Sequence, residues 1–194
     1  MAPASETRRN IIDAVLRIIG QDGIAAVTNR RIAKEAGVSL GSVTYHFATQ
    51  HALLRESLLH FVAEETRHFT ALADACSDED FDIGQAAEAV AGGNVFDSRH
   101  IAPFELYVEA GRDERLRAAA AEGFAAYDLL AGRILTRLGV PDPERLAGVA
   151  VDLVFGRQLR RLATGAPAEE LVDTLLVLTR LAPAAPTPQG RQVT

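Results

Sequence analysis

The sequence predicts an all-α protein of one or two compact domains. Apolar residues recur three and four positions apart along most of its 194 residues, the spacing that places them on one face of a helix. Glycine and proline occur at intervals of about a helix length, and no alternating apolar and polar run typical of a strand is present. Hydrophobic residues make up 48% of the chain and charged residues 24%, which is the composition of an ordinary globular protein.

The same patterns predict about nine helices. The expected ranges are residues 6–21, 28–36, 39–47, 49–75, 83–91, 102–110, 113–138, 143–164 and 167–181. Glycine or proline separates many of them, notably at Gly23, Gly37, Gly92-Gly93 and Pro141. The final segment, PAAPTPQGRQVT, is rich in proline and polar residues, so residues 183–194 are expected to be disordered.

Charge is distributed unevenly along the chain, whose net charge is −6. Residues 1–50 carry six basic and four acidic side chains, a charge of +2, so the remainder carries −8. A slightly basic head on an acidic body fits a protein in which only the head meets phosphate.

The sequence has no feature that indicates a membrane-spanning or secreted protein. It contains no run of about 18 apolar residues, and its N-terminus lacks the basic and apolar regions of an export signal. The single cysteine, Cys76, cannot form an intrachain disulfide. The expected location is the cytoplasm.

Residues 28–47 combine helix caps, a turn glycine and a short segment of poor helix formers. Thr28 and Ser39 are suited to cap two helices, and Gly37 suits the left-handed position in the turn between them. At about 100° per residue, Val43 and Phe47 point to one side of the second helix. The opposite side carries Gly41, Ser42 and Tyr45. Apolar anchors therefore hold this helix from inside, and its outer face can approach another molecule closely.

The first of these two helices adds a basic face. Arg30, Arg31 and Lys34 lie opposite Ile32 and Ala36 on a helical wheel. A cation in the first turn opposes the helix dipole by roughly 0.3–1 kcal/mol, and a nearby phosphate would offset this for Arg31. Two such helices form a helix-turn-helix, whose second helix enters the major groove of DNA. Solvated surface charge is the alternative interpretation of the basic residues taken alone.

The segment TNRRIAKEAGVSLGSVTYHFATQHALL resembles the helix-turn-helix signature of the tetracycline-repressor (TetR) family. In that family a short recognition helix ends in an aromatic-rich Tyr-His-Phe run and leads directly into a long fourth helix. The resemblance covers about residues 8–54. It implies an all-α homodimer that binds double-stranded DNA at a pseudo-palindromic operator and is controlled by a small-molecule effector. It also implies a DNA-binding domain over residues 1–48 and a ligand-binding and dimerisation domain over residues 49–182.

The residues expected to contact DNA lie in or beside the helix-turn-helix. They are Thr28, Arg30, Arg31, Lys34, Ser39, Leu40, Gly41, Ser42, Thr44, Tyr45, His46 and Gln50. Two of them depart from the family's common pattern. Gln50 stands where many members have a lysine that touches phosphate, and Leu40 replaces a frequent lysine and is suited to contact a thymine methyl group. Both changes lower the expected number of phosphate contacts, so we predict modest affinity and a shallow salt dependence.

Aromatic residues are concentrated in the expected fourth to seventh helices, where the resemblance implies a ligand pocket. Polar residues in the same apolar surroundings are expected to orient an effector. The candidates are Phe61, Phe69, Asn94, Phe96, His100, Phe104, Glu105, Tyr107, Glu109, Phe124 and Tyr127. Plain hydrophobic core is the alternative for each aromatic residue, because core aromatic residues show the same helical spacing.

His60, Glu64 and His68 share one face of the expected fourth helix, at successive spacings of four residues. This arrangement suits a divalent metal with nitrogen and oxygen ligands. A solvated helix face explains it equally well. No metal, cofactor or catalytic residue is therefore assigned from the sequence.

The apolar stripes on the last two expected helices are too wide for a single partner. The eighth helix carries Leu146, Val149, Leu153 and Gly156, and the ninth carries Leu171, Leu175 and Leu178. Gly148 and Gly156, expected on one face, would allow another helix to approach closely. A four-helix interface between two copies of the chain is the natural use of this surface, and the resemblance to the TetR family implies the same.

These features together favour a ligand-responsive transcriptional regulator, most simply a repressor. Effector binding is expected to move the long fourth helix, which is continuous with the head. An all-helical enzyme is the alternative from another class, but the sequence shows no nucleophile with a plausible base, no glycine-rich phosphate loop and no His/Cys metal signature. A helical DNA-binding protein with no effector is the remaining alternative.

Overall fold

The computed structural model describes residues 4–75, 97–167 and 173, and within these residues the protein is entirely helical. The elements are α1 (Ala4–Asp22), the 3₁₀ helix η1 (Ile24–Ala26), α2 (Asn29–Ala36), α3 (Leu40–His46), α4 (Gln50–Ala75), α6 (Ser98–Ala110), α7 (Glu114–Arg137) and α8 (Pro143–Thr164). The predicted all-α class is confirmed. The helices expected at 83–91 and 167–181, and the expected disordered tail, lie outside the described residues.

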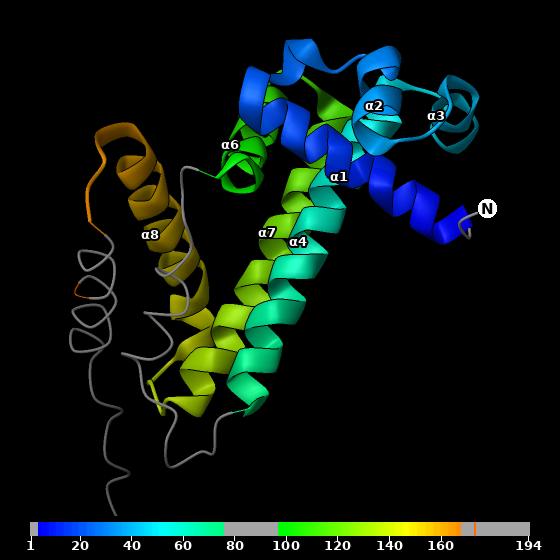
Figure 1. Ribbon diagram of the computed structural model, residues 1–194. Coiled ribbons are helices and arrows are strands. Elements are labelled where there is room, and N and C mark those ends of the chain that lie inside the picture. Colours follow the sequence, from blue (N-terminus) through cyan, green and yellow to red (C-terminus); the bar gives the residue numbers. More distant parts are fainter. Residues whose placement is uncertain (1–3, 76–96, 168–172, 174–194) are drawn as a thin grey trace, which may run out of the picture.

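The helices form a head and an elongated body (Figure 1). In the head, α1, α2 and α3 pack together at one end of the molecule. The long helix α4 starts in the head and runs into the body, where α7 lies alongside it. Helix α8 packs on α7 near their connecting turn and diverges from it toward α6, which lies beneath α1. Head and body are thus joined by the continuous helix α4 and by the contact of α1 with α6.

One hydrophobic core runs through both parts. Five apolar residues of α1 are all 0–1% exposed: Ile11, Ile12, Val15, Leu16 and Ile19. Leu58 of α4 and Leu106 of α6, both 0% exposed, belong to the same cluster. Burying side chains of this size stabilises the fold by about 1.5–3 kcal/mol each. The head is therefore held on the body by shared packing and not by α4 alone.

Helices α1 and α6 approach each other unusually closely at Gly20. A Cβ atom placed on Gly20 would lie 1.9 Å from the backbone oxygen of Ser98, the first residue of α6. Next to this contact, Glu105 of α6 accepts a hydrogen bond from the backbone N–H of Ile24, at 2.9 Å. The N-cap residue of η1 is Gly23, which has no side chain to cap the helix. The Glu105 carboxylate therefore satisfies the backbone donor at the start of η1.

Some helix boundaries differ from the sequence-based ranges. Helix α6 begins at Ser98, four residues before the expected start at 102, because Asp97 caps it by accepting a hydrogen bond from Arg99 N at 3.0 Å. The helix continues through Pro103, whose ring nitrogen has no hydrogen to donate. The predicted limits of α8, 143 and 164, are confirmed. Among the described helices, none is both long and apolar enough to cross a membrane.

Candidate nucleic-acid interface and aromatic cluster

The two short helices of the head are capped as the sequence predicts. The Thr28 hydroxyl accepts a hydrogen bond from Arg31 N at 3.3 Å, and the Ser39 hydroxyl accepts one from Ser42 N at 3.0 Å. Gly37 between the helices has φ 66°, the left-handed conformation that ends α2. Because each capping hydroxyl accepts from the backbone, its own hydrogen remains available for a phosphate oxygen.

Helix α3 is anchored from within and exposed outside. Val43 is 0% and Phe47 6% exposed, which fixes the inner face as expected. On the outer face Tyr45 is 83% and Leu40 53% exposed. The remaining expected DNA contacts of this helix, Gly41, Ser42, Thr44 and His46, are all exposed or half-exposed. A short helix that presents a bare tyrosine, a leucine and small polar groups matches the shape that a DNA groove accepts.

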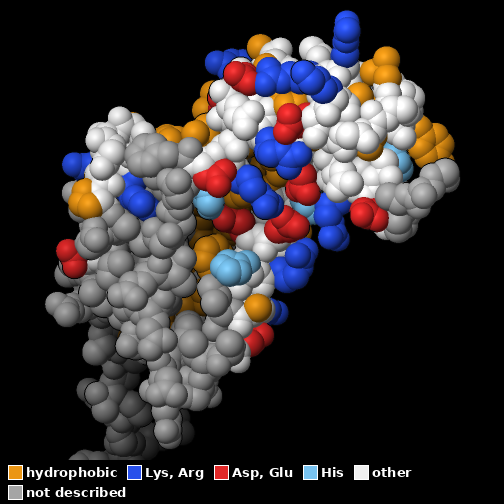
Figure 2. Space-filling view, viewed as in Figure 1, with side chains coloured by type: hydrophobic (Ala, Val, Ile, Leu, Met, Phe, Trp, Pro, Cys, Tyr) orange, Lys and Arg blue, Asp and Glu red, His pale blue; other side chains and the backbone are white. Residues whose placement is uncertain are grey.

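A basic hollow lies beside this helix. It is open to solvent and is lined by Thr28, Arg30, Arg31, Lys34 and Glu35. Figure 2 shows basic side chains spread over the same end of the molecule. Three cations and a hydroxyl converging on one hollow are suited to bind phosphate oxygens.

Arg31 corrects one expectation about this hollow. The cation was expected to need a phosphate to offset the unfavourable dipole at the start of α2. In the structure the Asp22 carboxylate, at the end of α1, pairs with Arg31. The offset is therefore built into the protein, and Arg30 and Lys34 remain the more available cations of the hollow.

The junction of η1, α2 and α4 explains the role of Gln50. Its side-chain amide donates a hydrogen bond to the backbone oxygen of Val27, at 3.2 Å. The residue stays exposed but its amide is engaged in holding the start of α4 against the head. The preceding Thr49, which sequence reasoning missed, caps α4 by accepting from Ala52 N at 3.1 Å. A hydroxyl residue directly before a long helix was the available signal.

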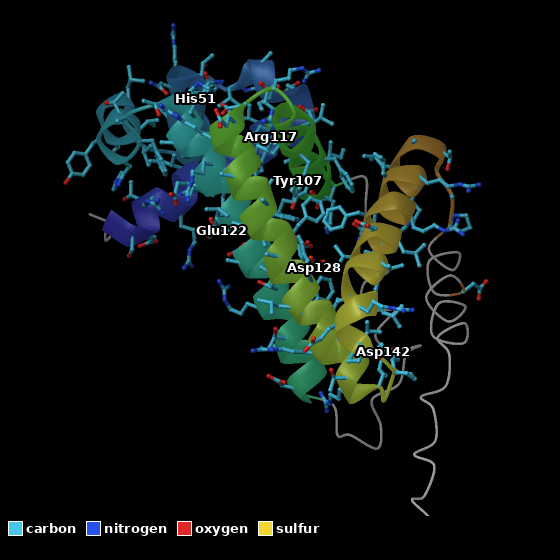
Figure 3. The ribbon with its side chains drawn as sticks, turned by 180° about the vertical axis from the view of Figure 1, so that it is seen from behind. His51, Tyr107, Arg117, Glu122, Asp128 and Asp142 are labelled. Carbon is cyan, nitrogen blue, oxygen red and sulfur yellow. The ribbon has the colours of Figure 1, made fainter. Side chains whose placement is uncertain are left out.

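Five aromatic rings from three helices meet in the body, in what we call the aromatic cluster: Phe104, Tyr107, Phe124, Tyr127 and Phe155. Phe155 of α8 is the hub, with ring centroids 4.9 Å from Phe124, 5.4 Å from Tyr127 and 5.6 Å from Tyr107. Figure 3 shows Tyr107 on α6, beside α7. Four members were expected from the sequence. Phe155 was missed because the apolar residues of α8 were assigned to a dimer interface.

The cluster contains an acid that the sequence did not reveal. Tyr127 donates a hydrogen bond from its hydroxyl to the Glu65 carboxylate of α4, at 3.0 Å. Burial raises the pKa of the Glu65 carboxyl, an effect only partly opposed by this hydrogen bond. Burial likewise raises the pKa of both the Tyr107 and the Tyr127 hydroxyl, which stay neutral. The Tyr107 hydroxyl is buried and close enough to the Tyr127 hydroxyl for each to affect the pKa of the other.

The other expected ligand residues have different positions. Phe61 is 8% exposed and belongs to the hydrophobic core, and Phe69 stacks against His68 with ring centroids 5.4 Å apart. Glu105 accepts a hydrogen bond from Ile24 N in the head, a role that the sequence did not indicate.

Glu109 forms an ion pair with Arg112 at 3.3 Å. His100 is half-buried; its Nδ1 is buried without a partner among the described residues, and burial lowers its pKa. Asn94 and Phe96 lie outside the described residues.

Charged side chains gather where the head meets the body, as Figure 2 shows. His60 Nε2 lies 3.3 Å from Glu64, and Arg99 of α6 donates to the other oxygen of Glu64 at 2.9 Å. Asp13 of α1 completes a group with His60 and Glu64 whose potential ligand atoms lie within 4.8 Å of one another. His68, expected as the third member, is exposed and does not belong to this group. The Arg99 cation already balances Glu64, so an ion pair joins α4 and α6 within this group.

The residues of α8 expected at a subunit surface are partly exposed, and the expected interface stays a prediction. Val149 is 50% exposed, and a Cβ on Gly156 would meet no atom within 4 Å. Leu146 and Leu153 are half-buried. Gly148 differs from the expectation, because a Cβ placed on it would lie 3.8 Å from the Asp128 carboxylate of α7. Leu171, Leu175 and Leu178 lie outside the described residues.

A capped helix-turn-helix with an exposed second helix, joined by one long helix to a helical body, defines the class of helix-turn-helix transcriptional regulators. Two family models match the two parts of the chain. "Bacterial regulatory proteins, tetR family" matches residues 11–57, and "Tetracyclin repressor-like, C-terminal domain" matches residues 82–182. The protein belongs to the TetR family of DNA-binding transcriptional regulators.

Individual relatives agree with this assignment. The HTH-type transcriptional regulator BetI of Agrobacterium fabrum is 29% identical over 164 residues, which are 82% of this chain and 79% of BetI. The regulator AcrR of Shigella flexneri is 40% identical over 53 residues, 27% of this chain and only 25% of AcrR. The multidrug binding protein EbrR, in a crystal structure with imidazole, is 35% identical with a TM-score of 0.70, covering 94% of this chain and 98% of EbrR. EbrR has also been crystallised with ethidium.

Proposed function

We propose that the protein acts in the cytoplasm as a homodimeric repressor, whose two α3 helices enter successive major grooves of a pseudo-palindromic operator. The observation that carries this proposal is the outer face of α3, where Tyr45 and Leu40 are exposed although Val43 and Phe47 anchor the same helix in the core. An exposed tyrosine and leucine on a buried scaffold make a surface suited to bases. The hollow at Arg30 and Lys34 supplies phosphate contacts beside it.

Two features of the head reduce its electrostatic attraction to DNA. Arg31 is paired with Asp22, and Gln50 is a neutral residue whose amide is bonded to the protein. Each phosphate contact contributes about one unit to the salt dependence of binding. We therefore expect a shallow salt slope and a larger share of the binding energy from base contacts.

The proposed effector binds in the body at the aromatic cluster and releases DNA. The contact between α1 and α6, made by Gly20, Ser98 and Glu105, links this cluster to the head, since α6 also carries Tyr107. A ligand that shifts α6 would move α1, and with it the spacing of the two recognition helices. The effector must bind the DNA-incompetent arrangement more tightly than the competent one. The EbrR complexes with imidazole and ethidium support a small-molecule effector.

The test is a selection of bound sequences from random and genomic DNA, with the full-length protein at two salt concentrations. We expect a palindromic motif with half-sites about 34–36 Å apart, one turn of B-DNA or a multiple. Recovery of sequence-independent, strongly salt-dependent binding alone would contradict the proposal. Analytical ultracentrifugation of the same sample should show a dimer, with or without DNA.

A further inference from the structure

We infer that the effector is an organic cation, held against the partly exposed rings of the aromatic cluster with the Glu65 carboxylate as its counter-ion. This inference rests on the proposed function, because it assigns the chemical class of the effector. The side chains that form the proposed site belong to α4, α6, α7 and α8.

The Glu65 carboxylate has few bonded partners within the described residues. Within the described residues Glu65 forms no ion pair, and Tyr127 is the hydrogen-bond donor that reaches it. A carboxylate has room for about four hydrogen bonds, and leaving a charged one desolvated without a cation is strongly unfavourable. The neighbouring Glu64 differs, because Arg99 and His60 both lie against its carboxylate. Glu65 is thus an acid among aromatic rings with no cation bonded to its carboxylate, and the charge of Arg99, which is bonded to Glu64, only partly compensates it.

The aromatic rings near this acid are partly exposed. Tyr107, Phe124 and Phe155 are each half-buried, so part of every ring is available beyond the contacts they make with one another. Aromatic faces attract a cation within about 6 Å of the ring centre, and most strongly where water is excluded. Rings and a carboxylate together are complementary to a flat or quaternary organic cation.

Other ligand classes fit this group of side chains less well. An anion would be repelled by Glu65, and Arg99, whose charge acts on Glu65, is already bonded to Glu64 at 2.9 Å. A neutral apolar ligand would bury the carboxylate further without a partner. A cation satisfies both the acid and the rings.

The experiment uses the full-length protein without DNA and two organic cations of different shape. Ethidium is the fluorescent probe, and tetraphenylphosphonium is the competitor. Ethidium binding is followed by fluorescence, and tetraphenylphosphonium by its displacement of ethidium and by calorimetry. We expect Glu65→Gln, which keeps the bond to Tyr127 but removes the charge, to weaken ethidium binding at least about tenfold. The matched control is Glu64→Gln, one residue earlier on α4, which should change the affinity for ethidium less than about twofold.

A second variant tests the rings independently. Phe155→Leu keeps an apolar side chain at the hub and should weaken ethidium binding several-fold, while thermal melts confirm that both variants fold. The inference is overturned if the wild-type protein binds neither cation, or if Glu65→Gln binds ethidium as tightly as wild type. DNA binding is measured on the same samples. Specific DNA binding without cation binding would reject this inference alone, whereas absence of specific DNA binding would reject the proposed function.

Discussion

Tyr45 is 83% exposed although Val43, two positions before it on α3, and Phe47, the residue that caps the end of α3, are buried. Such a ring contributes little to the fold, so its contribution to DNA binding can be tested separately from stability. We expect Tyr45→Ala and Arg30→Ala each to weaken operator binding by roughly 1–3 kcal/mol. Titrations by fluorescence anisotropy measure the loss. The control is Arg115→Ala on α7, which removes an exposed arginine of the body and should leave DNA binding unchanged.

The Arg30 and Tyr45 variants should remain dimeric and melt at the wild-type temperature. Loss of the dimer in either variant would contradict the separation of head and body on which the proposed function depends.

Glu65 makes the stability of the protein depend on pH. Burial raises the pKa of its carboxyl above the ordinary 4.5, so the folded state holds this proton more tightly than the unfolded state. The stability that the folded state gains from this proton is fully present below pH 4.5, and it is lost as the pH rises through the folded-state pKa. Glu65→Gln removes the buried charge. The variant should therefore melt at a higher temperature than wild type at about pH 7.5 and at nearly the same temperature at about pH 4.

His100 affects stability in the opposite direction. Burial lowers its pKa, so protonation of the unfolded state below pH 6.5 makes the protein less stable as the pH falls. Comparing Glu65→Gln with wild type at each pH cancels this effect, since both proteins contain His100. Equal melting temperatures for the two proteins across this range would show that the Glu65 carboxylate is compensated in the folded state.

At the scale of the element, the contact of α1 with α6 makes a sharp prediction. Gly20→Ala places a methyl group where the backbone oxygen of Ser98 lies, so the two helices must separate. Overpacking of this kind costs about 1–3 kcal/mol. Gly132→Ala is the matched control within α7, because its new methyl group would make only an ordinary contact of 3.9 Å with Ala147. It should stabilise the helix by roughly 0.5–1 kcal/mol.

Chemical denaturation measures both glycine variants. The Gly20 variant should also release DNA at a lower effector concentration, because separated helices resemble the proposed induced arrangement. Unfolding curves that match wild type for Gly20→Ala would contradict the close packing at this point.

Helices were predicted more completely than the sites they carry. The caps at Thr28 and Ser39 and the anchors Val43 and Phe47 were identified because their signals are local in sequence. The long-range roles were missed. Glu64 and Glu65 are adjacent acids, and only the packing of α7 and α6 against α4 decides that one meets Arg99 and the other meets Tyr127. The role of Glu105 likewise depends on Ile24, 81 positions away.

At the scale of the whole molecule, the exposed face of α8 predicts how two copies meet. Val149→Asp would place a charge at the centre of the proposed interface, where it would be buried without a partner. We expect the dimer dissociation constant to rise at least about 100-fold, equivalent to roughly 2.7 kcal/mol. Sedimentation equilibrium measures this change. Leu129→Asp, at a residue of α7 that is 72% exposed, is the control and should remain a dimer.

Monomers of the Val149 variant should also bind the operator more weakly, because each carries one recognition helix. A dimer of unchanged affinity in Val149→Asp would place the subunit interface on another face.

Helix α8 carries residues of both proposed surfaces, the effector site and the subunit interface. Its inner side carries Phe155, the hub of the aromatic cluster, and its outer side carries Val149 and Gly156. Any tilt of α8 that accommodates an effector also changes the fit of the two subunits, and thermodynamic linkage makes the effect reciprocal: assembly changes effector affinity by the same factor as the effector changes assembly. The effector concentration that releases DNA should consequently vary with the abundance of the regulator itself. Cells that make more of this protein would thereby adjust the sensitivity of the response as well as its extent.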